Sequence, residues 1–275
     1  MEKIAILIIN HETPEQTQKL ADHIFTYFDK NNYDLTLVDN SRWFPLDTAD
    51  IKNTYNKGFD QVVIEWLKEK RSKNYAGYWT LNSDCLLTEV DYAKELLKYL
   101  RPESTVGLLS TLVHERKGWG NDDPLQNPQN IKHNTPQEIG YVDFQSAIIS
   151  KNLLDKFIFN NDLVYYLGGL DMDFNICCEN NGYKKVLLPH LELTHLGAQS
   201  YREADGTLIT ERVDQIVKED ELKHISRLHL EDSISTGNGL MEYGIRKRYN
   251  LDIFIERSRM VQTPAISYKE GENNE

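Results

Sequence analysis

Short apolar runs alternate with amphipathic helical patterns through most of the chain. Residues 3–10 form a continuous apolar run that is too short for a helix, a pattern typical of a parallel strand buried on both faces. Residues 13–16 then have the sequence of a helix start, with Thr13 as N-cap, Pro14 at the first helical position and Gln16 closing a capping box. Apolar residues at helical spacing continue this helix to about Asp29.

The alternation of strands and helices continues to about residue 200. The further predicted strands are 33–38, 75–81, 105–112, 141–150 and 185–188. The further predicted helices are 59–70, 92–100, 151–157 and 172–181, the last of them ending before Gly182. Strands that alternate with helices at this spacing predict βαβ units and a mostly parallel sheet flanked by helices.

Beyond this α/β region the pattern changes. Two helical patterns follow, at 210–229 and about 239–249, and the polar tail is expected to be disordered. We therefore divide the chain into an α/β domain (1–204), a C-terminal helical extension (205–268) and a tail (269–275). Within the first of these, residues 115–136 are rich in Asn, Asp and Pro and predict a long surface loop, a kind of loop that is more often functional than not.

Composition narrows the class of protein. A chain of 275 residues with 40% hydrophobic residues can bury a large core, and its net charge of −12 argues against a general nucleic-acid coat. No segment approaches the roughly 20 apolar residues of a membrane-spanning helix, and the first residues read as a buried strand rather than a signal peptide. The three cysteines lack a CxxC spacing, which favours reduced, buried thiols in a cytoplasmic protein.

Polar residues follow three of the predicted strands, as Asn10-His11-Glu12, Asp39-Asn40-Ser41 and Asn82-Ser83-Asp84. Ligands of an open parallel sheet bind at the carboxyl ends of its strands, so these groups and Asn56-Lys57-Gly58 are predicted to form one rim. Each group alone is equally well explained as a turn. The absence of GxGxxG after the first strand and of GxxxxGK[ST] anywhere disfavours a dinucleotide-binding domain and a P-loop enzyme.

The order of several segments carries more information than any one of them. IAILIINHETPEQTQKL, LTLVDNSR, NKGFDQ, YAGYWTLNSDCLL, YVDFQSAIIS, GGLDMDF and ELTHLGAQS together resemble a glycosyltransferase of the GT-A fold. The chain is most similar to the inverting family-two enzymes, in the branch that contains rhamnosyltransferase-like proteins, over about residues 3–201. This resemblance implies an α/β GT-A domain, here followed by a helical appendage.

The resemblance also implies a nucleotide-binding set. Asn10 and Glu12 correspond to positions where the first strand-loop of the family meets the nucleotide base, and Asp39 to the carboxylate that binds the base or ribose. Asn56 and Gly58 match the N-x-G turn beside the nucleotide. The donor implied is a UDP-, dTDP- or GDP-sugar.

A metal site is implied by the same comparison. Asn82-Ser83-Asp84 matches the metal-binding motif of the family, in which two acids commonly flank one residue, but Asn82 replaces the first acid and leaves Asp84 as the carboxylate. His195 corresponds to a late histidine that often completes the metal site or contacts the diphosphate. Oxygen-rich ligands favour Mg²⁺ or Mn²⁺, which would stabilise the leaving diphosphate.

Asp171 corresponds to the catalytic base of these enzymes, with Asp173 as the second choice. A carboxylate must take the proton of the acceptor hydroxyl as that hydroxyl attacks the anomeric carbon. Both residues also have structural explanations, because Asp171 directly precedes a helical pattern and could be its N-cap, and Asp173 could favour the helix dipole. Leu170 stands where the family usually has Glu, which keeps the choice between the two aspartates open.

We therefore expect a metal-dependent, inverting hexosyl or deoxyhexosyl transferase that moves one sugar to an acceptor hydroxyl. The expected acceptor is a saccharide or lipid-linked saccharide, with a protein or a modified nucleobase as the alternative. A catalytically inactive sugar-nucleotide binding protein is the second hypothesis, because of Asn82 and Leu170, and a nucleotidyltransferase is the third. A peripheral membrane contact and homo-oligomerisation through the C-terminal helices are further hypotheses about its partners.

Overall fold

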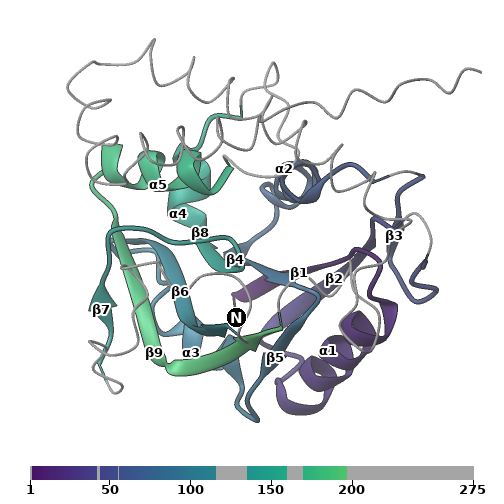
Figure 1. Cartoon of the computed structure of the whole chain (residues 1–275). Helices are drawn as coiled ribbons and strands as arrows, with labels where there is room; N and C mark the ends of the chain where they lie inside the picture. The colour runs from purple at the N-terminus through teal and green to yellow at the C-terminus, as the bar shows by residue number, and fades with distance from the viewer. Residues whose placement is uncertain (1, 42–43, 55, 116–134, 160–169, 197–275) are drawn as a thin grey trace, which may run out of the picture. The chain divides into compact units, whose positions relative to one another are not determined.

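The computed structural model describes residues 2–41, 44–54, 56–115, 135–159 and 170–196, all of which belong to one compact unit (Figure 1). In these residues a single nine-stranded sheet is covered by helices on both faces. Its strands are β1 (Lys3–Asn10), β2 (Tyr33–Asp39), β3 (Ile51–Lys52), β4 (Tyr75–Asn82), β5 (Cys85–Leu87), β6 (Val106–Glu115), β7 (Gln137–Glu138), β8 (Ser146–Ser150) and β9 (Lys184–His195). The helices are α1 (Pro14–Tyr27), α2 (Phe59–Lys70), α3 (Tyr92–Leu97), α4 (Lys151–Lys156) and α5 (Leu170–Asn180).

The sheet has the strand order β3-β2-β1-β4-β8-β6-β9-β5, with β7 also paired to β9. Strands β3, β2, β1 and β4 are parallel to one another, and β6 is parallel to β9. Strand β8 is antiparallel to both of its neighbours, β4 and β6, so β6 and β9 run in the same direction as β4. The predicted mostly parallel sheet is therefore confirmed, with β5, β7 and β8 as the antiparallel members.

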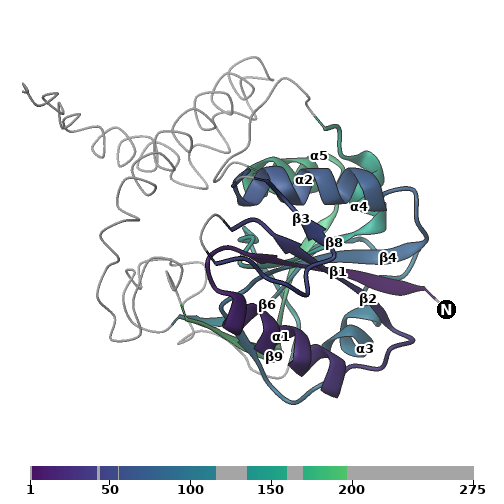
Figure 2. The same ribbon diagram turned by 90° about the vertical axis from the view of Figure 1, so that its right-hand side faces the viewer.

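Two hydrophobic clusters lie on the two faces of the sheet. Ile4, Ile6 and Ile8 of β1 pack in one cluster with residues of α1 and α3. The alternate residues Ala5 and Leu7 pack in the other cluster with residues of α2, α4 and α5. Figures 1 and 2 show these two groups of helices on opposite sides of the sheet. Burial of both faces explains why β1 is a continuous apolar run and not an alternating one.

The long periodic elements agree with the sequence. Strand β1 and helix α2 have the predicted bounds, and α1 begins at Pro14 as expected. The predicted capping bond is wrong, because Thr13 occupies the N-cap position but its side chain makes no cap hydrogen bond. Its hydroxyl lies 2.7 Å from the Ser83 hydroxyl instead, and thereby connects the start of α1 to the end of β4.

Several boundaries differ from prediction. Strand β8 begins only at Ser146, because Val142 forms its hydrogen bonds with a side chain of α5 and not with a strand. Strand β9 continues past Pro189 to His195. Its pairing with β6 shifts register there, because Thr111 pairs with Leu188 and the next residue, Leu112, pairs with Glu192. The short strands β3, β5 and β7 were not predicted, since two or three residues show no periodicity.

Some predictions fall outside the described residues. The loop predicted at 115–136 lies there except at its ends, as do both predicted C-terminal helices and the tail. The division of the chain at residue 204 therefore stays a prediction. Among the helices that are described, none combines the length and apolar character needed to cross a membrane.

Candidate active site

The carboxyl ends of β1, β2 and β4 meet at one edge of the sheet. Asn10 is the register partner of Asp39, and Ile9 is the partner of Asn82. Because the three strands are parallel and adjacent, the polar groups that follow them in sequence leave the sheet at the same edge. This edge, with the loops that follow the three strands, is called the rim below.

Asn10 orders the first part of the rim. It is 0% exposed, and its Nδ2 lies 2.9 Å from Asp39 Oδ1 and 2.7 Å from Ser41 Oγ. Its Oδ1 accepts hydrogen bonds from the Thr13 N–H and the Thr17 hydroxyl, both at 3.1 Å. One buried amide therefore joins the ends of β1 and β2 to the start of α1.

Glu12 fixes the loop after β2 onto the loop after β1. Its Oε2 accepts the Phe44 N–H at 2.8 Å, and its own N–H donates to Ser41 Oγ at 2.8 Å. Asn10 Nδ2 lies 3.2 Å from the Phe44 carbonyl oxygen, so the backbone of Phe44 is held on both sides. Glu12 has a φ of 61°, a left-handed conformation that is costly outside glycine and persists where neighbouring contacts enforce it.

A chain of amides brings the start of α2 to the rim. Asn40 Nδ2 donates to Asn56 Oδ1 at 2.8 Å, and the same oxygen accepts the Gly58 N–H at 2.8 Å. Asn56 Nδ2 lies 3.0 Å from His11 Nε2. Gly58 has a φ of 81°, a left-handed conformation that favours glycine, and α2 begins directly after it.

Asp84 and His195 meet although they are far apart in sequence. Strand β5 pairs with β9 so that Cys85 lies opposite His195, and the Leu196 N–H donates to the Asp84 carbonyl at 3.0 Å. As a result, His195 Nε2 lies 3.1 Å from Asp84 Oδ1, and the two side chains are 13% and 11% exposed. The antiparallel β5–β9 pair, which the sequence did not predict, is what positions this pair.

Asn82 and Ser83 join the Asp84–His195 pair to the rest of the rim. Asn82 Nδ2 lies 3.3 Å from His195 Nε2, and the Ser83 hydroxyl makes the buried contact with Thr13. The structure therefore brings together all of the residues that were predicted to bind nucleotide or metal. His11, Asn40 and Ser41 belong to the same network, and the sequence placed them in the rim without giving them a role.

The Asp84–His195 pair can supply two ligands to a metal ion. No group of three His, Cys, Asp or Glu side chains suited to a metal occurs within the described part of the chain. Mg²⁺ in phosphate sites commonly takes one or two carboxylates from the protein and fills its remaining positions with water and phosphate oxygens. The carboxylate and imidazole here fit a divalent cation of this kind when an oxygen-rich ligand completes its coordination.

Asp171 lies at the start of α5, next to the first turn of α2. The Tyr141 hydroxyl donates a hydrogen bond to Asp171 Oδ2. The Leu170 N–H, at the start of α5, donates to Asp60 Oδ2 in the first turn of α2 at 3.2 Å. Asp171 is therefore close to the α2 side of the sheet, whereas Ser83, next to Asp84, contacts the residue that precedes α1.

The N-cap explanation for Asp171 is wrong, because α5 already begins at Leu170 and Asp171 lies inside its first turn. Asp173 lies in the same turn. The pKa of the Cys177 thiol is raised, first by burial of the thiol and second by the charge of Asp173. Burial, followed by the charges of Asp171 and Asp143, raises the pKa of Tyr141 well above its usual value near 10. Tyr141 is thus a protonated donor to Asp171 at any physiological pH.

Comparison with known proteins gives matches among solved structures. No protein-family model matches the chain, and no curated protein does. A structure of GalNAc-T7 with UDP, GalNAc and Mn²⁺ matches with a TM-score of 0.55 and 13% identity, covering 71% of this chain and 44% of that protein. S. aureus TarS matches with a TM-score of 0.53 and 16% identity over 82% of this chain and 44% of TarS. Its 1–349 segment matches with a TM-score of 0.51 and 14% identity, over 86% of this chain and 74% of that segment.

These matches bear on the fold, and the chain spans less than half the length of the first two proteins. The strand order, the helices on both faces and the three structural matches agree with the fold that the ordered segments implied. The chain has the GT-A fold.

Proposed function

We propose that this protein is a glycosyltransferase that moves one sugar from a nucleotide-diphosphate sugar to an acceptor hydroxyl. The observation that carries the proposal is the position of two carboxylates in a GT-A fold, one at the rim and one beside the first turn of α2. Asp84, paired with His195, lies towards α1, and Asp171 lies towards α2. Such an arrangement suits a reaction in which one group holds the leaving diphosphate and another accepts a proton. UDP and Mn²⁺ are present in the matched GalNAc-T7 structure, which supports the same donor chemistry here.

In this proposal the network of Asn10, Glu12, Asp39, Asn56 and Gly58 forms the nucleotide subsite. Its members are fixed by buried or part-buried hydrogen bonds to one another and to neighbouring backbone. A preorganised subsite avoids part of the entropic cost of ordering loops on binding. Base and ribose recognition is therefore assigned to the loops after β1 and β2 and to the start of α2.

Asp84 and His195 are proposed to hold Mn²⁺ or Mg²⁺ together with the diphosphate. When bound, the cation neutralises negative charge that grows on the diphosphate as the glycosidic bond breaks. Asn82, 3.3 Å from His195 Nε2, orients the imidazole. Ser83 joins this subsite to the start of α1 through Thr13.

Asp171 is proposed as the catalytic base, ahead of Asp173. The acceptor oxygen bonds to the anomeric carbon, its proton passes to the Asp171 carboxylate, and the nucleoside diphosphate leaves with the electron pair of the glycosidic bond. One displacement of this kind inverts the configuration of the sugar. Asp171 and Asp173 both lie in the first turn of α5.

The proposal is tested by a donor screen followed by turnover. Thermal stabilisation by UDP-, dTDP- and GDP-sugars is measured with Mn²⁺, and release of nucleoside diphosphate is then measured for each sugar that stabilises the protein. Asp84→Ala is expected to abolish turnover, and Asp171→Asn to lower it by about 100-fold or more while donor binding is retained. Asp34→Asn is the matched control, because Asp34 is a hydrogen-bonded carboxylate at the opposite end of β2 and should leave turnover unchanged.

A second candidate, a GT-A protein that binds sugar nucleotide without turnover, is favoured by the single carboxylate of the metal motif. Asn82 replaces an acid there and contacts His195. This candidate predicts stabilisation by a donor with Mn²⁺ but no release of nucleoside diphosphate. If no sugar nucleotide stabilises the protein, both candidates are contradicted. The acceptor is proposed to be a saccharide or lipid-linked saccharide, with a protein or modified nucleobase as the alternative.

A further inference from the structure

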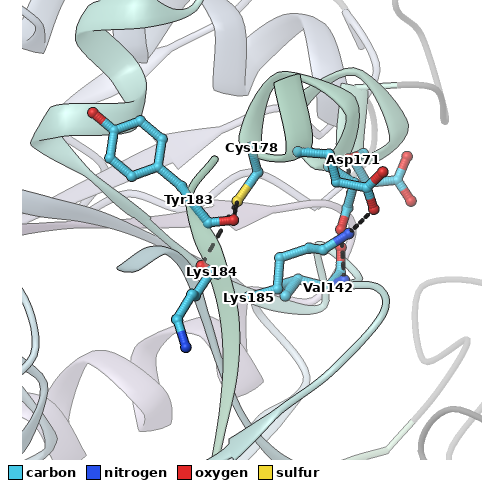
Figure 3. A network of polar contacts seen from close by, with 8 residues as sticks. Val142, Asp171, Cys178, Tyr183, Lys184 and Lys185 are labelled. Atoms are coloured by element: carbon cyan, nitrogen blue, oxygen red, sulfur yellow. Dashed lines mark hydrogen bonds and ion pairs between the residues drawn. The ribbon is translucent and has the colours of Figure 1, made fainter. Parts of the chain in front are cut away.

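The segment before β8 is attached to α5 by one buried amide. Asn175 is 0% exposed, its Oδ1 accepts the Val142 N–H at 2.9 Å, and its Nδ2 donates to the Val142 carbonyl at 2.9 Å. One side chain thus satisfies both backbone groups of Val142, as a neighbouring strand would. The same Nδ2 donates to the Asp171 carbonyl at 2.7 Å, so the amide ties Val142 to the first turn of α5. Figure 3 labels Val142 and Asp171.

This attachment determines where Tyr141 lies. Because Val142 is held from both sides, the preceding residue is held against the first turn of α5, and its hydroxyl donates to Asp171 Oδ2. The aromatic ring has only two side-chain torsions, so this contact is rigid compared with one from a lysine or glutamine. The Asp171 carboxylate is therefore restrained in its rotation by a donor that keeps its proton at physiological pH.

The backbone around Asp171 is fixed independently. The N–H of the preceding residue, Leu170, donates to Asp60 Oδ2, and the carbonyl of Asp171 accepts from Asn175. Backbone and carboxylate are thus both held, by residues of α2, α5 and the segment before β8. A carboxylate that only favoured the helix dipole would gain little from restraint of its orientation, whereas a proton acceptor depends on it.

We propose that Tyr141 is a positioning residue, which orients the Asp171 carboxylate towards the acceptor hydroxyl, and that Asn175 holds Tyr141 in place. The inference rests on the proposed role of Asp171 as the base. Tyr141 keeps its own proton throughout, and the proton of the acceptor passes to Asp171. Tyr141 begins the segment YVDFQSAIIS, but the sequence assigned no role to it or to Asn175.

Tyr141→Phe tests the inference because it removes the hydroxyl and keeps the ring. We expect kcat to fall by about 10-fold to 100-fold, with the KM for the donor sugar within twofold of the wild-type value. In the Asp171→Asn background, Tyr141→Phe should cause no further loss, because the hydroxyl acts only through that carboxylate. Tyr75→Phe is the matched control, since it removes a Tyr–Asp hydrogen bond of 3.0 Å to Asp34, at the opposite end of the sheet.

Asn175→Asp is a second variant of nearly the same shape. It replaces the donor that faces the carbonyls of Val142 and Asp171 by an acceptor. We expect a loss in kcat of the same order as that of Tyr141→Phe, and little additional loss when the two are combined. A wild-type kcat in Tyr141→Phe, or losses from Tyr141→Phe and Asp171→Asn that multiply, would overturn the inference.

A readout without turnover separates this inference from the proposed function. The ¹³C resonance of the Asp171 carboxyl carbon is expected to shift in Tyr141→Phe and to stay in place in Tyr75→Phe. If wild-type protein does not turn over any donor but the resonance shifts, the proposed function fails and the Tyr141–Asp171 contact stands. If wild-type protein turns over a donor and neither kcat nor the resonance changes in Tyr141→Phe, the inference fails and the proposed function stands.

Discussion

Three acidic side chains of the candidate site each have a hydrogen-bonding or ion-pair partner. Glu12 accepts the Phe44 N–H, Asp84 contacts His195, and Asp171 accepts the Tyr141 hydroxyl. Hydrogen bonds to ionised groups are about twice as strong as those between neutral groups, so this rim tolerates several carboxylates at one edge. The sequence identified these acids and His195, but it assigned no role to Phe44 or Tyr141, and only the folded chain brings their donors near the acids.

Asn10→Ala should destabilise the protein by about 3 kcal/mol, because it leaves several buried partners without a hydrogen bond. Urea unfolding measures the loss. Asn31→Ala is the control, since Asn31 is exposed and its side chain bonds to the nearby Asp29, and its effect should stay within about 0.5 kcal/mol. Equal effects of the two substitutions would show that the Asn10 network contributes no more than a surface turn.

Cys178 should make the stability of the protein depend on alkaline pH. Its thiol faces the Tyr183 and Lys184 carbonyls (Figure 3), and burial raises its pKa from 9.0 to about 12. Between these values the folded protein keeps a proton that the unfolded chain loses. The contribution to stability is therefore complete below pH 9 and is lost as the pH rises to about 12.

Urea unfolding between pH 8 and pH 10 checks this expectation. Above pH 9, the free energy of unfolding of the wild-type protein should fall more steeply with pH than that of Cys178→Ala. The difference between the two slopes should be about 1.4 kcal/mol per pH unit. Tyr75→Phe should not change the slope in this range, because the pKa of Tyr75 rises from 10.0 to about 12 and its window begins higher. Parallel curves for wild type and Cys178→Ala would contradict the expectation.

At the scale of elements, hydrophobic periodicity predicted the strands and helices that are long enough to pack against the two hydrophobic clusters. Strand β1 and helix α2 matched their predicted bounds because each presents a long apolar pattern to a cluster. Strand β5 has three residues and pairs with β9, which is about 100 residues later in the sequence. The position of His195 beside Asp84 could not follow from sequence periodicity for that reason.

The turn from α5 into β9 depends on backbone conformation at Gly182. Its φ is +69°, and a side chain there would meet nothing within 4 Å. Gly182→Val should therefore cost about 1–2 kcal/mol through conformation alone. Gly182→Asn should cost less than Gly182→Val, because Asn tolerates the left-handed region. Thermal or urea unfolding measures both, and equal losses would point to a packing cause that the open surroundings do not provide.

At the scale of the whole molecule, the fold was implied by the order of segments and not by any one of them. The matched structures have only 13–16% sequence identity to this chain, yet they share its fold. Strand ends of a parallel sheet converge whatever their exact sequence, which is why the rim could be predicted. The Thr13–Ser83 contact within the rim and the Tyr141–Asp171 contact at the start of α5 depend on loop paths that no local pattern encodes.

The net charge of −12 sets the expected salt dependence of nucleotide binding. Without a divalent cation, an acidic rim repels a nucleoside diphosphate, so the affinity for UDP should rise as NaCl is raised from 20 to 300 mM, because salt screens repulsion. With Mn²⁺ the contact becomes attractive, and the same increase in salt should weaken binding. Calorimetric titration of UDP measures both slopes.

Asp84→Asn should remove the reversal of sign, because it removes the carboxylate proposed to hold the cation, whereas Asp34→Asn should preserve it. Slopes of one sign with and without Mn²⁺ would contradict a cation held between Asp84 and the diphosphate.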